Sequence, residues 1–350
     1  MAELPENPRI VVHGAGSIGC WIGGAWRAAG LDVAFLGRAS VRDEIAADGL
    51  TLTDSEKRRI ELRPDEVELS VNPKLLRQAD IIALAVKSMG TAAAAKEIAK
   101  HARKDTIVIS FQNGVSNVET LKTILPGFTV LHGMVPFNVA HMGNGRWHKG
   151  VAGTLWAEDH PVTRALAERI STKPGGLTLS ENMAGVAWGK LLVNLNNAVN
   201  ALSGRPLLEE LGNRDYRRVW AAAQIEGLEL LKAAGIEPAK IGPFPPRLFP
   251  HIVGAPDWLF NSTVLKLYKV DADARSSMAD DFAAGRATEV DHLNGEVVRL
   301  ARRLGREAPV NAAIVDLVRQ AEAGVERAWD GAALRRHVLA GHRGAAGFGY

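Results

Sequence analysis

The chain has 350 residues, of which 47% are hydrophobic and 23% are charged, and 42 basic and 39 acidic residues give a net charge of +3. This length is too great for one compact core of ordinary size, so two domains are expected. The balanced charge argues against a nucleic-acid-binding protein, and no apolar run approaches the roughly 20 residues that a membrane-spanning helix needs. The single cysteine, Cys20, and the absence of a secretory signal predict a cytoplasmic location.

The first predicted elements are an apolar strand at residues 9–13, a glycine-rich turn at 14–19 and a helix at 20–29. In this context a G-x-G-x-x-G motif is typical of dinucleotide binding. The first glycine permits the tight turn, the second lets a pyrophosphate approach the backbone, and the third lets the helix pack on the strand. Free N–H groups at the helix start would bind the phosphates. The alternative is a glycine-rich turn that binds no ligand. The predicted cofactor-binding residues of the turn are Gly14, Gly16, Ser17, Ile18 and Gly19.

A second strand, at residues 32–36, indicates which dinucleotide is bound. Sites for NAD usually carry Asp or Glu after this strand to hold the ribose 2′-hydroxyl. Here the strand runs into Gly37 and Arg38 with no carboxylate at its end. A guanidinium suits a 2′-phosphate, so the sequence favours NADP(H) over NAD(H). The competing interpretation is a solvated loop arginine.

Two further apolar runs, at residues 80–86 and 106–111, alternate with helices predicted at 91–101 and 117–125. This alternation predicts a parallel, doubly wound sheet of the Rossmann type. Ligands of such sheets bind beyond the carboxyl ends of the strands, where Lys87 and Asn113 stand. Their position at the strand ends makes both residues candidates for ligand binding. Judged by residue type alone, they would be interpreted as a surface lysine and a turn-forming Asn-Gly pair.

Shorter strands and hairpins complete the first domain. Alternating residues at 50–53 and 59–63 predict an edge hairpin, and a second hairpin is predicted around Asn144-Gly145. Further strands are expected at 128–132, 152–156 and 177–179, with a helix at 161–171. After residue 182 nearly everything is predicted to be helix or proline-rich connection, including an irregular loop at 243–256. The expected domains are therefore an α/β domain at 1–181 and an all-α domain at 182–335, followed by a flexible tail at 336–350.

The most informative later segment is a mostly apolar helix predicted at residues 188–202. Lys190, Asn194 and Asn197 share one of its faces, because they follow a spacing of i, i+4 and i+7. A polar stripe on a buried helix costs free energy unless it has partners. We interpret the stripe as facing a ligand. The alternative is a stripe that faces solvent or joins the domains.

A second polar group contains Ser277 and Glu289, twelve residues apart. On one straight helix they would be about 18 Å apart, so a shared site requires the chain to turn back between them, for which Gly285 is suited. Spacing alone does not decide between this arrangement and a helical hairpin with solvated acids.

Together these segments resemble ketopantoate reductases (2-dehydropantoate 2-reductases), which belong to the 6-phosphogluconate dehydrogenase-like reductases. The resemblance covers residues 9 to about 325. It rests on the glycine turn, Arg38, Val86-Lys87, Gln112-Asn113-Gly114, residues 188–194, the serines and acids of 276–281, and residues 288–295.

The resemblance implies NADPH-dependent reduction of a 2-oxo acid to a 2-hydroxy acid, on the pantothenate route to coenzyme A. It implies that Lys190 donates the proton, that Asn113 positions Lys190 or the nicotinamide ribose, and that Glu289 accepts hydrogen bonds from the substrate hydroxyl and the cofactor. Asn194 would bind the hydroxyl and Ser277 the substrate carboxylate, while Lys87 would lie over the cofactor. The resemblance provides no metal ligand.

Two departures concern the substrate. The family's second asparagine, eight residues after the lysine, is replaced by Ala198, which leaves Asn197 as the candidate to compensate. Ala274 and Arg275 also stand where the family carries an asparagine upstream of the serines. The alternatives are a reductase of another 2-oxo acid or an imine, or a non-catalytic NADP(H)-binding regulator. The small-molecule substrate is the expected partner, with no nucleic acid or membrane, and the protein is expected to be a monomer or homodimer.

Overall fold

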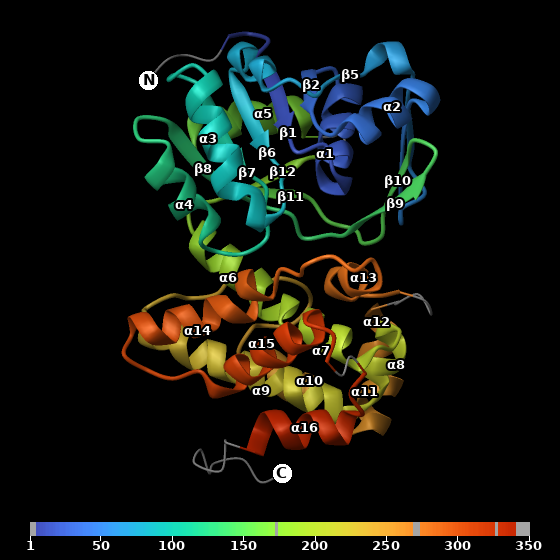
Figure 1. Cartoon of the computed structure of the whole chain (residues 1–350), viewed down its shortest axis with the longest axis vertical. Coiled ribbons are helices and arrows are strands. Elements are labelled where there is room, and N and C mark those ends of the chain that lie inside the picture. The colour runs from blue at the N-terminus through green and yellow to red at the C-terminus, as the bar shows by residue number, and fades with distance from the viewer. Residues whose placement is uncertain (1–4, 172–173, 269–273, 326–327, 341–350) are drawn as a thin grey trace. The chain divides into compact units, whose positions relative to one another are not determined.

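The computed structural model of the chain describes residues 5–171, 174–268, 274–325 and 328–340. The chain divides into two compact units, Met1–Met183 and Ala184–Tyr350 (Figure 1). The first unit combines strands and helices, whereas the described residues of the second contain helices and no strand. The predicted fold class, a Rossmann-type doubly wound sheet followed by an all-α domain, is confirmed.

The first unit is built on an eight-stranded sheet in the order β12-β11-β8-β7-β6-β1-β2-β5. All neighbouring pairs are parallel except β8 and β11, which are antiparallel. The central strands are apolar and buried, as expected of strands covered on both faces. The strands are β1 (Arg9–His13), β2 (Asp32–Leu36), β5 (Glu68–Ser70), β6 (Ile81–Leu84), β7 (Ile107–Ser110), β8 (Thr129–Met134), β11 (Leu155–Glu158) and β12 (Leu177–Ser180).

Helices cover both faces of this sheet and create two cores. Alternate residues of each strand point to opposite faces, so Ile10 and Val12 enter one core and Val11 enters the other. The first core also takes residues of α1, α2 and α5, and the second takes residues of α3 and α4. These helices are α1 (Ser17–Ala28), α2 (Ala39–Asp48), α3 (Thr91–His101), α4 (Asn117–Ile124) and α5 (Pro161–Ile170).

A second, four-stranded sheet has the order β4-β3-β10-β9. Both predicted hairpins form, but they pair with each other through parallel β3 and β10, so the expected edge hairpin belongs to a separate sheet. This small sheet packs on α1 with the Lys149 ammonium lying 4.8 Å from the Trp21 ring centroid and 4.3 Å from that of Phe137. Its strands are β3 (Leu50–Asp54), β4 (Arg59–Leu62), β9 (Val139–Gly143) and β10 (Arg146–Lys149).

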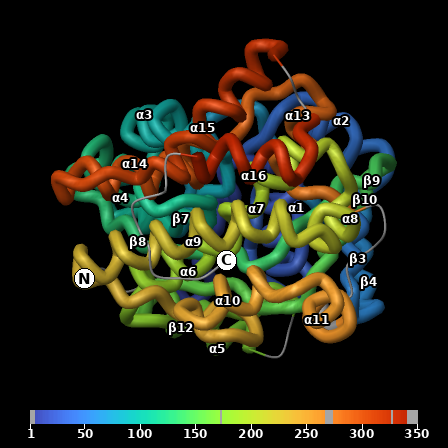
Figure 2. The backbone as a smooth tube through the Cα atoms, turned by 90° about the horizontal axis from the view of Figure 1, so that it is seen from below, coloured from blue at the N-terminus to red at the C-terminus, as the bar shows by residue number. Residues whose placement is uncertain are grey.

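The second unit is organised around α9, the helix Arg214–Ala233, which contacts α7, α8, α10, α14, α15 and α16 (Figure 2). Its face of buried residues follows the helical period and includes Trp220, Gln224 and Leu231. The other helices are α6 (Met183–Asn194), α7 (Asn196–Ser203), α8 (Leu207–Gly212), α10 (Phe249–Val253), α11 (Asp257–Ser262), α12 (Val264–Tyr268), α13 (Ser277–Ala283), α14 (Asn294–Arg303), α15 (Pro309–Glu322) and α16 (Gly331–Leu339).

Three features of the second unit differ from the sequence prediction. The helix expected at 188–202 is interrupted at Leu195, one turn after Leu192, whose carbonyl accepts hydrogen bonds from side chains of α9. The predicted irregular loop at 243–256 contains the short helix α10, which Pro250 can enter because it occupies the first turn. Residues 336–339, assigned to the flexible tail, belong to α16, whose start is capped by the Asp330 carboxylate. The rest of that predicted tail, 341–350, lies outside the described residues.

Candidate functional site

The glycine turn between β1 and α1 has two glycines that packing requires. Gly14 has a φ of +108°, and a Cβ there would lie 2.7 Å from the Val86 nitrogen. A Cβ on Gly19 would lie 2.1 Å from the Gly14 carbonyl oxygen, so only glycine lets α1 start this close to the turn. These two positions perform the roles that the motif predicts for its first and third glycines.

Gly16 is different, because nothing in the protein lies within 4 Å of the place where its Cβ would be and its φ of −92° suits any residue. Gly16 is the N-cap residue of α1, and no side chain caps the N–H groups at this end of the helix. The first turn of the helix contains no acidic residue. The backbone therefore borders an open space at a helix N-terminus, where the first N–H groups favour an anion. The residues present fit the pyrophosphate of a dinucleotide cofactor.

The end of β2 lies directly against this turn. The backbone nitrogens of Gly14 and Ala15 donate to the Leu36 carbonyl over 2.9 and 3.1 Å, and a Cβ on Gly37 would lie 2.5 Å from the Ala15 Cβ. Arg38 follows at the start of α2, exposed, and none of the described residues pairs with its guanidinium. By contrast, Arg42 of the same helix pairs with Asp43 over 2.7 Å. Arg38 is thus held beside the glycine turn through its backbone.

Lys87 and Asn113 follow neighbouring strands, β6 and β7, and both side chains are exposed. The segments that carry them are joined beneath the surface. Ser88 Oγ donates to the Asn113 carbonyl over 3.0 Å, and Gln112 Nε2 donates to the Val86 carbonyl over 3.0 Å. The backbone on either side of the two candidates is therefore fixed by buried hydrogen bonds.

At the centre of this buried network is the Thr91 hydroxyl, which is 2% exposed. It lies 2.7 Å from Gln112 Nε2, 2.8 Å from the Ser88 carbonyl and 2.8 Å from Asn117 Oδ1. Asn117 Nδ2 in turn donates to Ser88 Oγ and to the Asn113 carbonyl. The single Thr91 hydroxyl hydrogen can bond either the Ser88 carbonyl or Asn117 Oδ1, and a buried network of this kind rigidifies the loops that it joins. Thr91 and Asn117 were not predicted to belong to the site. In the sequence they could be recognised only as the first residues of two predicted helices.

The second unit carries the polar stripe. Lys190 and Asn194 lie in α6 and Asn197 lies in α7, beyond the interruption. Lys190 is half-buried as a residue, and burial lowers the pKa of its ammonium to about 8 because desolvation disfavours the charged form. Asn194 is buried and Asn197 is half-buried. An amine with a pKa near neutrality is suited to donating a proton in a reaction.

Ser277 is brought to this stripe by the start of α13. Asn197 Nδ2 donates to Ser277 Oγ over 3.3 Å. The preceding residue, Ser276, caps α13 by accepting from the Ala279 nitrogen, and its hydroxyl donates to the Asn197 carbonyl over 3.1 Å. The Ser276 nitrogen donates to Asn200 Oδ1 over 2.9 Å. Residues 80 positions apart therefore form one polar group that neither segment could reveal alone.

Glu289 follows the turn that ends α13. Gly285 has a φ of +63°, a conformation that favours glycine, and lies just beyond the end of α13, which is the first of the two arrangements that spacing left open. The Thr288 nitrogen donates to Glu322 Oε1 over 2.7 Å, and the Glu289 carbonyl accepts from the His292 nitrogen over 2.9 Å. The half-buried Glu289 thus stands on a segment held by α15.

Gln224 is a further residue that the sequence analysis missed. It is buried in α9, and its side-chain nitrogen donates to the Leu192 carbonyl at the interruption between α6 and α7. The sequence does mark this residue as unusual. Gln224 shares a helical face with Trp220, Gly227 and Leu231, and a polar side chain on such an apolar face indicates a buried hydrogen bond.

Comparisons with known proteins agree with this architecture. The family model described as ketopantoate reductase PanE/ApbA matches residues 10–161, and the model of its C-terminal part matches residues 182–322. A 2-dehydropantoate 2-reductase of Halobacterium salinarum is 28% identical over 327 residues, covering 90% of this chain and 99% of that protein. An uncharacterized oxidoreductase of Bacillus subtilis, YkpB, is 26% identical and covers 86% and 95%.

Solved structures show the same fold. The crystal structure of a PanE/ApbA family ketopantoate reductase from Ralstonia eutropha is 27% identical, with a TM-score of 0.77 over 90% of this chain and 99% of that one. A D-mandelate dehydrogenase bound to NADH and anilino(oxo)acetate shares the fold at 18% identity, with a TM-score of 0.75 and coverage of 90% and 99%. So does a dimeric ketopantoate reductase from Staphylococcus aureus, at 20% identity, a TM-score of 0.68 and coverage of 90% and 99%.

None of the helices in the described ranges combines the length and the apolar character needed to cross a lipid bilayer. The glycine turn fits a dinucleotide, Lys190 with its lowered pKa and the neighbouring asparagines lie in the helical unit, and the two family models together match most of the chain. The protein therefore belongs to the ketopantoate reductase PanE/ApbA family of nicotinamide-dependent oxidoreductases.

Proposed function

We propose that this protein uses NADPH to reduce a 2-oxo acid to the 2-hydroxy acid, with 2-dehydropantoate, the precursor of pantoate in coenzyme A synthesis, as the first candidate substrate. One observation carries the proposal. Lys190, with a pKa lowered to about 8, lies on the same helical stripe as Asn194, and Asn197 beyond it contacts Ser277. An acid, hydrogen-bonding amides and a hydroxyl are the groups that a 2-oxo acid requires.

NADPH, when bound at the glycine turn, would supply the hydride that the keto carbon requires. As the carbon–oxygen double bond becomes an alkoxide, the Lys190 ammonium stabilises the negative charge and donates its proton to that oxygen. Asn194 binds the same oxygen, and Glu289 accepts a hydrogen bond from the new hydroxyl and from the cofactor. Ser277 binds the substrate carboxylate, and Asn197 takes the part of the family asparagine that Ala198 replaces.

The cofactor would be held by the first unit. Backbone N–H groups of Gly16, Ser17 and Ile18 would bind the pyrophosphate at the start of α1. Arg38 would bind the 2′-phosphate, which is the basis for proposing NADPH instead of NADH. Lys87 would lie over the cofactor, and Asn113 would position the nicotinamide ribose or Lys190.

A second candidate is a related reductase of another 2-oxo acid or of an imine. The observation that favours it is Ala198, which is fully buried and carries no polar group where the family has asparagine. A non-catalytic NADP(H)-binding regulator is the remaining alternative. It has no use for a buried lysine whose pKa is lowered to about 8. We further propose that the protein acts in the cytoplasm, which is supported by its single cysteine. It is proposed to be a monomer or homodimer.

The test is to measure NADPH oxidation by the purified full chain with 2-dehydropantoate and with each of a panel of branched and aryl-substituted 2-oxo acids. Turnover of 2-dehydropantoate with the highest kcat/KM supports the first candidate, and a preference for another 2-oxo acid supports the second. Imines are assayed in the same way. Tight NADPH binding without turnover of any of these compounds would refute the enzymatic proposal and support the regulator.

A further inference from the structure

The interruption between α6 and α7 has an identifiable cause. In a regular helix the Leu192 carbonyl would accept the Asn196 N–H, since bonds join residues four apart. The last regular bond runs from the Leu195 nitrogen to the Leu191 carbonyl, over 3.0 Å. The Leu192 carbonyl instead accepts from Gln224 Nε2 over 3.1 Å and, more weakly, from Trp220 Nε1 over 3.4 Å. Insertion of a side chain into the hydrogen-bond ladder is a recognised cause of helix breaks.

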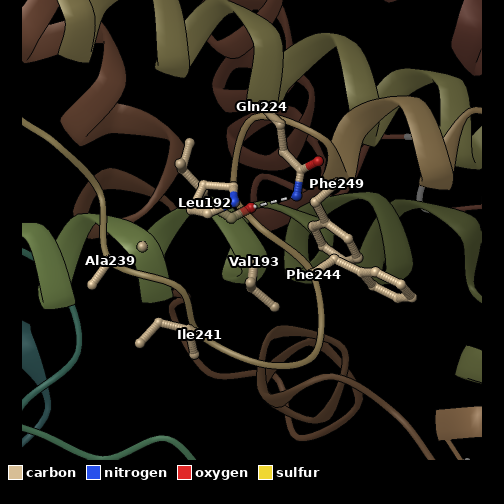
Figure 3. Close-up of a pocket in the computed structure, with 9 residues that line it drawn as sticks. Leu192, Val193, Gln224, Ala239, Ile241, Phe244 and Phe249 are labelled. Carbon is tan, nitrogen blue, oxygen red and sulfur yellow. Dashed lines mark hydrogen bonds between the residues drawn. The ribbon is translucent and has the colours of Figure 1, made fainter.

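Gln224 and Trp220 of α9 both donate to the Leu192 carbonyl of α6, so the two helices meet at this point. One turn after Gln224, a Cβ on Gly227 would be 2.9 Å from Leu192 Cδ2, so a larger residue there would displace the Leu192 side chain. Figure 3 shows the amide nitrogen of Gln224 directed at the Leu192 carbonyl and its oxygen turned away. Only the nitrogen can donate to a carbonyl, so this orientation of the amide is fixed by chemistry.

The same amide lines a small pocket between α6 and the proline-rich segment before α10, with Val193, Phe244 and Phe249 among its walls (Figure 3). Gln224 Oε1 is buried there without a hydrogen-bond partner among the described residues. An unpaired buried oxygen costs free energy. The hydrogen bond from Gln224 Nε2 to the Leu192 carbonyl is the interaction that an apolar side chain of the same length could not make.

The consequence of the interruption is seen in the asparagines of α7. Asn196 donates to Glu210 over 3.0 Å, Asn197 donates to Ser277, and Asn200 accepts from the Ser276 nitrogen. Ala198 is fully buried. Three asparagines of α7 are thus engaged at once, and the asparagine that contacts Ser277 is at position 197 and not at 198.

We infer that Gln224 is a positioning residue that sets the register of α7 and thereby selects which 2-oxo acid the site accepts. By holding the Leu192 carbonyl, it lets the chain start a new helix at Asn196 and brings Asn197 to Ser277. This inference rests on the proposed function, because Asn197 and Ser277 are the proposed substrate-binding side chains. Gln224 itself touches neither reacting atoms nor cofactor.

The direct test is Gln224→Met, which keeps the length of the side chain and removes its N–H donor. We expect kcat/KM for the best 2-oxo acid to fall about 5- to 30-fold, the range for loss of one or two hydrogen bonds, chiefly through KM. The preference within the panel should change, and the NADPH dissociation constant should stay within about twofold, since the cofactor residues that bind phosphate lie in the first unit. An unchanged KM and an unchanged preference would overturn the inference.

A double-mutant cycle separates positioning from a general loss of stability. If Gln224 acts through Asn197, then Asn197→Ala should cost little more in the Gln224→Met background, because contacting or serially acting residues are not additive. Additive losses would overturn the inference. Leu230→Val is the matched control, since it weakens packing in the same helix at a buried position; it should lower Tm without changing the substrate preference.

A structure of the full-length Gln224→Met variant provides a readout that needs no activity. We expect α6 and α7 to join, with the Asn196 N–H bonded to the Leu192 carbonyl and the Asn197–Ser277 hydrogen bond lost. An interruption that persists with that bond intact would overturn the inference even if the enzyme is active. If the wild-type chain reduces no 2-oxo acid but the helices join in the variant, the proposed function fails and the positioning role of Gln224 stands.

Discussion

Replacing Lys190 with methionine removes the ammonium and keeps most of the apolar stem. If Lys190 donates the proton, kcat and kcat/KM should fall together by about 10²–10⁴, as for other general acids, because the interaction is made in the transition state. This corresponds to about 3–5.5 kcal/mol of lost transition-state stabilisation. The NADPH dissociation constant should hardly change, since the glycine turn and Arg38 are untouched.

The lowered pKa of Lys190 predicts a pH profile for the wild-type enzyme. Burial brings this pKa from 10.5 to about 8. An acid with that pKa is about 90% protonated at pH 7 and about 10% at pH 9, so kcat/KM for reduction should be level below about pH 7 and fall about tenfold per unit above pH 8. An ordinary exposed lysine would delay the fall until about pH 10.5.

The assay is initial-rate NADPH oxidation between pH 6 and 10, with Tm measured on the same preparations. Lys190→Arg is the control for charge, and it should not restore turnover because a guanidinium does not release its proton in this range. A lysine that only joins helices would give a lower Tm with turnover of the folded fraction intact. That result, or a fall in rate near pH 8 that survives in Lys190→Met, would refute the catalytic role.

The remaining predictions concern the cofactor and two buried groups. Arg38→Ala should weaken NADPH binding by about 1.5–3 kcal/mol and leave NADH binding nearly unchanged, which fluorescence titration can measure; equal losses for both would contradict the assignment. Thr91→Val removes the hydroxyl that joins Gln112 and Asn117 and should lower the free energy of unfolding in urea by about 1–3 kcal/mol, with Thr91→Ser close to wild type. Burial raises the pKa of Glu210 to about 8, so the folded state holds its proton between about pH 4.5 and 8 and the stability this contributes is lost as pH rises through 8. Glu210→Gln should therefore be more stable than wild type by about 2–4 kcal/mol at pH 9, and an equal loss of stability with pH in both proteins would be evidence against a neutral Glu210.

Much of the first unit could be predicted from the sequence because its signals are local. The helix Thr91–His101 and the strands Arg9–His13 and Asp32–Leu36 were predicted at their observed bounds, since apolar runs and turn residues define them. The elements that were missed, α2 and β5, have weaker patterns. Helix α2 contributes only Val41 and Ile45 to the core, and β5 has three residues.

The candidate site could be predicted only in part, because its geometry depends on distant contacts. The stripe of Lys190 and Asn194 follows from the helical period. The break that repositions Asn197 does not, because its cause, Gln224, lies 32 residues from Leu192. The pairing of Ser277 with Asn197 likewise joins residues 80 positions apart, and no local pattern encodes such a distance.

The small sheet that packs on α1 constrains the order in which the first unit can assemble. Its two hairpins close short loops and can form early, but they meet through β3 and β10, whose residues Thr53 and His148 are 95 positions apart. The intervening chain contains β5 to β8, half of the large sheet. Long-range pairings of this kind form slowly, so β3 and β10 should join only after much of the large sheet is in place. A chain still emerging from the ribosome would expose one edge of β3 until β10 had been synthesised.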